Sequence, residues 1–260
     1  MNANAKGLLA KAALLTATVI WGSSFFIMKN TLDTVPPFYM IAIRFSVAAV
    51  ILSLFFFKRL RHFDLKHLIG GGVMGAILFT AYCLQTFGLM STTPGKNAFL
   101  TTVYCMIVPF LCWAFLRVRP DIYNILASVI CIAGIGLVSL NESLAINLGD
   151  VLTLISGFFY AAHIVAVTRF SKGNDIFLLT IAQFAISGML GFVMALLFDP
   201  VPTQIGLDAG ISLLYLCLFS TTAALLLQNV GQKYTHPSTA AILLSLESVF
   251  GVLFSILFYG

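Results

Sequence analysis

One acidic residue, Glu247, lies in the middle of an apolar stretch that runs from Pro237 to Phe258. A helix rises ~1.5 Å per residue, so this carboxylate would lie about 15 Å past Pro237, near the midplane of a ~30 Å hydrocarbon layer. An ionised carboxylate at that depth costs several kcal/mol unless it faces a wet cavity, finds a partner or takes up a proton. Glu247 therefore indicates either a binding and coupling site or a carboxylate that is hydrogen-bonded where helices cross.

Polar and aromatic side chains recur at comparable depth in other apolar segments. Tyr104 follows Pro94 at the same spacing as Glu247 follows Pro237. Uncharged polar and aromatic groups around one acid suit an organic solute with hydrogen-bonding groups and some apolar surface. We therefore predict that the substrate is bound by Trp21, Ser24, Tyr82, Gln85, Tyr104, Tyr160, His163, Gln228 and Glu247.

Helical spacing supports this grouping. Asn97, Thr101 and Tyr104 recur at i, i+4 and i+7, which places them on one face of a helix. Of the nine residues, Glu247 and His163 are the candidates for coupling to protons, since an unperturbed imidazole titrates near ~6.5.

Each of these residues also has a structural alternative. A lone histidine such as His163 is more often a packing residue, tyrosines can donate to nearby carbonyls, and glutamines such as Gln85 and Gln228 can hold helices together. Trp21 could instead face lipid. Arg44 lies about 10 Å inside the outer end of its helix, so snorkelling or a structural ion pair is favoured over binding of an anionic substrate.

Composition places the whole chain in a bilayer. Of its 260 residues, 60% are hydrophobic and 9% charged, with a mean hydropathy of +1.03, whereas soluble domains hold ~45–50% apolar and ~25% charged residues. The net charge of +5 comes from short basic runs between apolar segments, which argues for membrane topology and against nucleic-acid binding. The five cysteines are scattered and form no disulfide or metal motif, so we expect no metal site. An enzyme would need a nucleophile, paired carboxylates or a metal cluster, whereas the sequence offers one deep Glu and one His on separate helices, so we expect no cofactor and no enzymatic activity.

Segments this long and uniformly apolar must be helices, because lipid leaves no partner for an open backbone. The fold class is therefore an all-α integral membrane protein. The nine predicted spans are about 8–28, 37–57, 68–91, 94–116, 122–140, 149–168, 176–198, 209–231 and 237–259.

Charges in the loops predict the orientation. Basic residues concentrate in alternate loops, and the intervening loops are mainly acidic. Lys6 and Lys11, at the N-terminus, belong to the basic set. The positive-inside rule then predicts a multi-pass protein of the cell (plasma or inner) membrane with a cytoplasmic N-terminus.

The chain also repeats itself. A shift of 143 residues sets Pro94 on Pro237, Gln85 on Gln228 and Tyr104 on Glu247. This predicts a first five-helix unit at 1–141 and a second at 148–260, and the odd number of helices inverts the second unit. Under the same shift, the fifth span would have a counterpart, a tenth span, beyond Gly260. We therefore expect a ten-helix fold whose tenth helix is missing through truncation, so that nine spans are present.

Several motifs together resemble one transporter family. They are Trp-Gly-Ser-Ser-Phe at 21–25, Pro37 with Arg44, Gln85 with Gly88-Leu89 and Pro94, and Ala-Ala-Ile-Leu-Leu-Ser-Leu-Glu-Ser-Val at 240–249. In this order they are similar to the EamA-type members of the drug/metabolite transporter (DMT) superfamily, although Ser248 stands where that family usually has Pro. The resemblance implies transport of small metabolites, notably amino acids outward, through a cavity lined by helices 1, 3, 4, 6, 8 and 9.

We therefore expect an alternating-access transporter of small polar or amphipathic metabolites, most plainly amino acids, with export as the direction. Its partners are the solute and the lipid bilayer. The sequence is compatible with both a monomer and a homodimer. A phosphosugar or nucleotide-sugar carrier is the first alternative, but phosphate calls for clustered Lys and Arg, and only Arg44 lies deep. A non-transporting structural membrane protein would instead have a dry, tightly packed centre.

Overall fold

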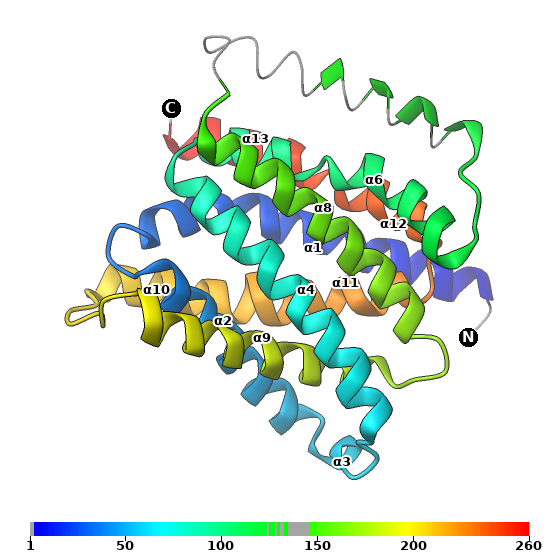
Figure 1. Ribbon diagram of the computed structural model, residues 1–260, viewed down its shortest axis with the longest axis horizontal. Coiled ribbons are helices and arrows are strands. Elements are labelled where there is room, and N and C mark those ends of the chain that lie inside the picture. Colours follow the sequence, from blue (N-terminus) through cyan, green and yellow to red (C-terminus); the bar gives the residue numbers. More distant parts are fainter. Residues whose placement is uncertain (1–2, 124, 128, 131–132, 135–145, 260) are drawn as a thin grey trace.

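The computed structural model describes residues 3–123, 125–127, 129–130, 133–134 and 146–259, and these residues form helices and no strands (Figure 1). Among the residues so described, eight helical spans are long and apolar enough to cross a membrane. The predicted fifth span, 122–140, falls largely outside the described residues. The elements are α1 (Ala3–Thr31), α2 (Pro37–Phe55), α3 (Phe57–Leu60), α4 (Leu65–Met90), α5 (Pro94–Thr101), α6 (Tyr104–Leu111), the π-helical turn η1 (Cys112–Leu116), α8 (Leu148–Phe170), α9 (Ile176–Phe198), α10 (Leu207–Tyr215), the π-helical segment η2 (Leu216–Ala223), α11 (Ala224–Lys233), α12 (Pro237–Leu244) and α13 (Glu247–Tyr259).

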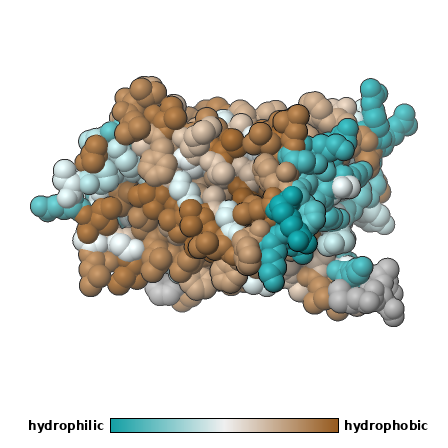
Figure 2. Space-filling model, turned by 90° about the horizontal axis from the view of Figure 1, so that it is seen from below, coloured by the Kyte–Doolittle hydropathy of each residue, from teal (hydrophilic) through white to brown (hydrophobic). Residues whose placement is uncertain are grey.

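The outer surface is apolar along most of its length. Figure 2 shows hydrophobic residues covering the middle of the molecule and polar residues gathered at the ends, most densely toward the end where the N-terminus lies. Large apolar side chains such as Leu54, Phe115 and Leu196 are exposed on this surface. Water would not tolerate so much contiguous apolar surface, whereas lipid does, so the described helices form a membrane-embedded bundle.

Local sequence sets where the helices begin. Pro37, Pro94 and Pro237 each occupy the first helical position, where the missing N–H costs nothing and the fixed φ suits a helix. Asp64 and Asn147 begin α4 and α8 through capping boxes, in which their side chains accept hydrogen bonds from backbone N–H groups of the first turn. The helices therefore start in the loops that the apolar pattern predicts.

Small residues let the central helices approach closely. α2 and α4 both pack on α9, and α4 also packs on α8. A Cβ atom added to Gly75 would lie 2.6 Å from the carbonyl oxygen of Gln183, and one added to Gly191 would lie 2.9 Å from Cα of Ala42. At both positions glycine therefore permits an approach between helices that a larger residue would prevent.

The fourth and ninth spans are each interrupted near their middle, whereas the sequence predicts continuous helices. α5 ends at Thr101 and α6 begins at Tyr104, while α12 ends at Leu244 and α13 begins at Glu247. The two breaks are 143 residues apart, which is the shift at which the sequence repeats.

The same hydrogen bonds accompany both breaks. The Thr102 hydroxyl donates to the carbonyl oxygen of Phe99 (2.7 Å), and the Ser245 hydroxyl donates to that of Ile242 (2.8 Å). Side-chain bonds of this kind bend helices because they compete with the backbone ladder. Pro109, which lies inside α6, does not account for the break, because the break lies upstream of it and recurs in the ninth span without a proline.

Candidate functional site

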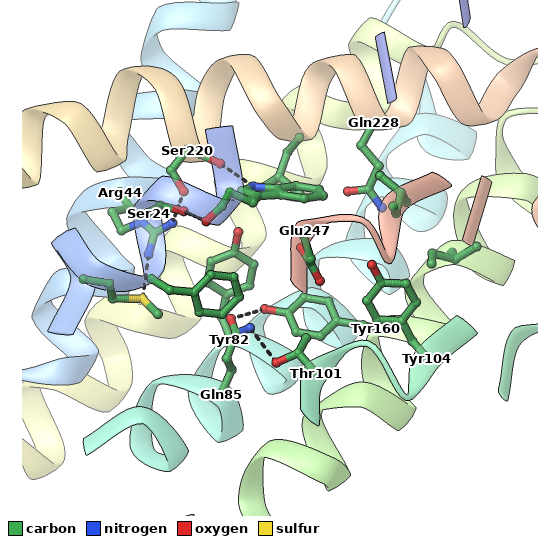
Figure 3. Close-up of a pocket in the computed structure, with 16 residues that line it drawn as sticks. Ser24, Arg44, Tyr82, Gln85, Thr101, Tyr104, Tyr160, Ser220, Gln228 and Glu247 are labelled. Atoms are coloured by element: carbon green, nitrogen blue, oxygen red, sulfur yellow. Dashed lines mark hydrogen bonds between the residues drawn. The ribbon is translucent and has the colours of Figure 1, made fainter. Parts of the chain in front are cut away.

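The centre of the bundle contains a pocket lined by α1, α2, α4, α5, α6, α8, η2, α11, α12 and α13 (Figure 3). Eight of the nine predicted binding residues line it, and His163 does not. The pocket also takes in Arg44, Thr101 and Ser220, which were not among the predicted binding residues. The predicted residues that meet here are Trp21, Ser24, Tyr82, Gln85, Tyr104, Tyr160, Gln228 and Glu247.

Tyr104 and Glu247 enter the pocket from the two interrupted spans. Each is the first residue of the helix that resumes after the break, and each is buried. The beginning of a helix carries partial positive charge, which suits a carboxylate, and transporters commonly place such half-helix starts at their sites. The Tyr104 hydroxyl and the Glu247 carboxyl lie close to each other in the pocket, where both can meet a solute (Figure 3).

A chain of hydrogen bonds positions the polar wall of the pocket. The Tyr160 hydroxyl donates to Oε1 of Gln85 (2.6 Å), and Nε2 of Gln85 donates to the Thr101 hydroxyl (3.1 Å). Asn97, one turn earlier on the predicted polar stripe, instead donates to the Thr153 hydroxyl of α8 (2.7 Å). Two members of the stripe therefore line the pocket, and Asn97 joins helices behind it.

Trp21 lies across the pocket from this wall and does not face lipid. Its indole N–H donates to the carbonyl oxygen of Ser220 (2.9 Å), which lies within the π-helical segment η2. The neighbouring Ser24 hydroxyl donates to the Trp21 carbonyl oxygen (2.8 Å) in the same helix. The hydrogen bond to Ser220 fixes the orientation of the Trp21 ring, which lines the pocket.

The interpretation of Arg44 as a snorkelling side chain is wrong. Arg44 is only 2% exposed and its guanidinium faces the pocket. Nε donates to the Thr221 hydroxyl (2.9 Å), one terminal nitrogen to the Ser220 hydroxyl (3.1 Å) and the other to the sulfur of Met28 (3.3 Å). These neighbours come from α1 and η2, so no pattern within the second span could have predicted them.

His163 lies outside the pocket, in a second buried polar cluster between α8, α9 and α11. Its Nε2 is 3.2 Å from Oε1 of Gln183, and Asn229 donates to the Thr180 hydroxyl at 3.0 Å. This arrangement matches the structural alternative for His163, in which the ring joins helices.

In this conformation the pocket is narrow. Its cavity volume is about 40 Å³, room for a few water molecules, whereas a cavity that holds benzene measures ~150 Å³. The polar groups are therefore assembled but closed around a small space, and the helices must separate to admit an organic solute.

Known proteins resemble the chain over nearly its full length. The EamA-like transporter family matches residues 8–140 and again 147–260. An uncharacterized transporter of Archaeoglobus fulgidus is 33% identical over 96% of this chain and 78% of its own, and the uncharacterized transporter YetK of Bacillus subtilis is 25% identical over 95% and 78%. A solved crystal structure shares the fold, with a TM-score of 0.76 and 15% identity over 95% of this chain and 87% of its own.

Two family matches cover most of the chain, and its relatives carry the name of transporters. The apolar surface, the interrupted spans and the central polar pocket are features that a transporter requires. These findings point to transport rather than catalysis. The chain belongs to the EamA-like transporter family.

Proposed function

We propose that the protein carries small polar or amphipathic metabolites, amino acids or related compounds, across the cell membrane by alternating access, with export as the net direction. The observation that carries the proposal is the pocket itself. Side chains from both predicted units, among them Tyr104 from the first and Glu247 from the second, converge on one buried, polar, aromatic-lined space. Such a lining suits a solute with both hydrogen-bonding groups and apolar surface.

The helix contacts support two inverted units at 1–141 and 148–260. α1 packs on α11 and α4 packs on α8, while α2 packs on α9 and α5 on α13. Counted by span within each unit, the first span of the first unit packs on the third span of the second unit, and the third packs on the first. The second spans pack on each other, and so do the fourth spans. Exchanging the two units leaves this set of contacts unchanged, as a two-fold relation requires, and an odd number of spans per unit would invert the second.

The interrupted spans suggest how the pocket opens. In our proposal the two units rock against each other about the centre, and the breaks before Tyr104 and Glu247 let the halves of each span move separately. Glu247 is the proposed coupling residue because its carboxylate lies in the pocket, on the path of the solute. His163 is not on that path, so we assign it to helix packing. The basic loops support a cytoplasmic N-terminus.

The first alternative, a phosphosugar or nucleotide-sugar carrier, finds little support in the pocket. Phosphate recognition uses clustered Lys and Arg, and among the described lining residues Arg44 is the one such cation. Lys96, near the predicted outer mouth, lies 2.8 Å from the carboxylate of Asp150, which already neutralises its charge. Both observations favour a solute without phosphate.

Reconstitution tests the proposal. Purified protein in liposomes is loaded with unlabelled amino acids, and the uptake of labelled amino acids by exchange is measured across a broad panel, with and without a pH gradient. We expect flux well above that of empty vesicles for a subset of amino acids. Flux no greater than in empty vesicles for every amino acid, alongside flux of a sugar phosphate, would favour the alternative.

A further inference from the structure

Arg44 is a buried cation for which the described residues provide no carboxylate. A guanidinium stays protonated in proteins, and a buried charge is costly unless an opposite charge meets it. The ion pairs among the described residues lie elsewhere, and none joins Arg44 to Glu247. Figure 3 shows Arg44 toward one end of the pocket and Glu247 apart from it, nearer Tyr104 and Gln228.

The neighbours of Arg44 orient the guanidinium without neutralising it. They are two hydroxyl groups, of Ser220 and Thr221, and the sulfur of Met28. The Tyr82 ring lies 5.1 Å from the guanidinium carbon. A guanidinium has five N–H donors, and the bonds to Thr221, Ser220 and Met28 use three of them, so donors remain for a further partner. A carboxylate suits a planar guanidinium best, because its two oxygens match paired N–H groups.

We infer that Arg44 binds the carboxylate of the solute, and that the pocket takes amino acids with the carboxylate at Arg44 and the ammonium group toward Glu247. This assignment rests on the proposed function and makes its substrate class specific. One guanidinium offers the charge for a single carboxylate, whereas a phosphate dianion calls for more cations. The basic group of Arg44 and the acidic group of Glu247 stand at separate places in the pocket, as the carboxylate and the ammonium group of an amino acid do.

A pair of probes that differ only in the carboxylate tests the assignment. Leucine and leucinamide share the ammonium group and side chain, and leucinamide replaces the carboxylate by a neutral amide. Binding is measured by thermal stabilisation of the purified protein, because a ligand that prefers the folded state raises its Tm. Exchange in liposomes is measured in parallel, and other acid and amide pairs follow if leucine is not a ligand.

We expect the wild-type protein to bind the acid better than the amide by roughly 10- to 100-fold, the range for hydrogen bonds to a charged partner. Arg44→Gln keeps a polar side chain and removes the charge, so this variant should bind the acid and the amide about equally. Arg44→Lys keeps the charge and loses the paired donors, so it should retain part of the preference. Arg61→Gln removes an exposed basic residue and should leave the preference unchanged.

The preference for acid over amide is a ratio, so a general loss of activity does not change it. If Arg44→Gln fails to fold, Arg44→Lys carries the test, and an undiminished preference in a folded variant overturns the inference. The inference also fails if the wild-type protein binds acid and amide of every pair equally, or none of them. Carboxylate-dependent stabilisation without any exchange would support Arg44 as the anion-binding residue while refuting the proposed transport of amino acids.

Discussion

Tyr104 and Glu247 occupy equivalent positions in the two halves of the chain. Each begins a helix after a break, and each points into the same pocket. The residues on either side of them make matching backbone hydrogen bonds: the amide of Cys105 donates to the carbonyl oxygen of Thr102 (3.0 Å), and that of Ser248 donates to the carbonyl oxygen of Ser245 (3.1 Å). The breaks thus place a phenol and a carboxylate at matching depth.

Removing the hydroxyl at a break should impair transport more than stability. In Ser245→Ala the bond to the Ile242 carbonyl is lost, at a cost of about 1 kcal/mol, and the span is freer to straighten. Because Glu247 follows the break directly, we expect exchange to fall several-fold while Tm changes by only a few degrees.

Thr16→Val provides the control for this prediction. The Thr16 hydroxyl also donates to a carbonyl of its own helix, that of Ala12 (3.0 Å), but at a position where α1 continues without a break. Exchange should stay at the wild-type level in this variant. Equal losses of exchange in Ser245→Ala and Thr16→Val would show that the break itself has no special role.

Glu247→Gln should separate exchange from proton coupling. Glutamine has nearly the same shape as glutamate and cannot release a proton, so a pH gradient should no longer drive accumulation. Exchange between equal solute concentrations needs no net proton movement and should persist, reduced by about tenfold or less. Asp33→Asn, at an exposed loop position, serves as the control. Accumulation that still follows the pH gradient in Glu247→Gln would remove the coupling role.

The sequence predicts much of the site because depth and spacing are local properties. Counting from Pro94 and Pro237 gives the depth of Tyr104 and Glu247 without any knowledge of neighbouring helices. The loop prolines and capping residues likewise locate the helix starts. Eight of nine predicted residues meet in the pocket for this reason.

Tertiary neighbours decide what the sequence cannot predict. Arg44 is held in the pocket by Ser220 and Thr221, which lie far along the chain. His163 is turned to Gln183 of α9, although its spacing from Tyr160 allowed it to face the pocket. The sequence does not predict the breaks before Tyr104 and Glu247, because a threonine or serine in an apolar segment is compatible with a continuous helix.

Two neighbouring glycines of α4 should respond very differently to alanine. A Cβ at position 75 would lie 2.6 Å from the carbonyl oxygen of Gln183, so α4 and α9 would have to separate, whereas a Cβ at position 72 has no atom within 4 Å. We expect Gly75→Ala to lower the free energy of unfolding by about 1–3 kcal/mol, the usual cost of overpacking. Gly72→Ala should be neutral or slightly stabilising. Thermal melting in detergent compares the two, and equal Tm values would contradict the packing of α4 on α9.

The ion pair between Arg59 and Asp175, at the end of the bundle that carries α3, should make the stability of the protein depend on pH. Arg59 lies 2.6 Å from the Asp175 carboxylate, which also accepts the backbone N–H of Phe177 (2.9 Å). Partial burial raises the pKa of Asp175, but the hydrogen bonds and charge from Arg59, with smaller help from Phe177 and Lys233, hold the pKa below its ordinary value.

Because the pKa of Asp175 is lower in the folded state, the ion pair contributes fully to the free energy of unfolding above the pKa of the unfolded chain, ~3.9. This contribution is lost as the pH falls through the pKa of the folded state. The pair is partly exposed to solvent, so its contribution to the free energy of unfolding should be below about 1 kcal/mol and should shrink in high salt. Asp175→Asn should therefore lower Tm slightly at neutral pH and match the wild-type protein in strong acid, because there the wild-type carboxylate is protonated too. Melting curves across the acid range check this, with Asp33→Asn as the exposed control. A difference between Asp175→Asn and the wild-type protein that grows as pH falls would have the wrong sign for this ion pair.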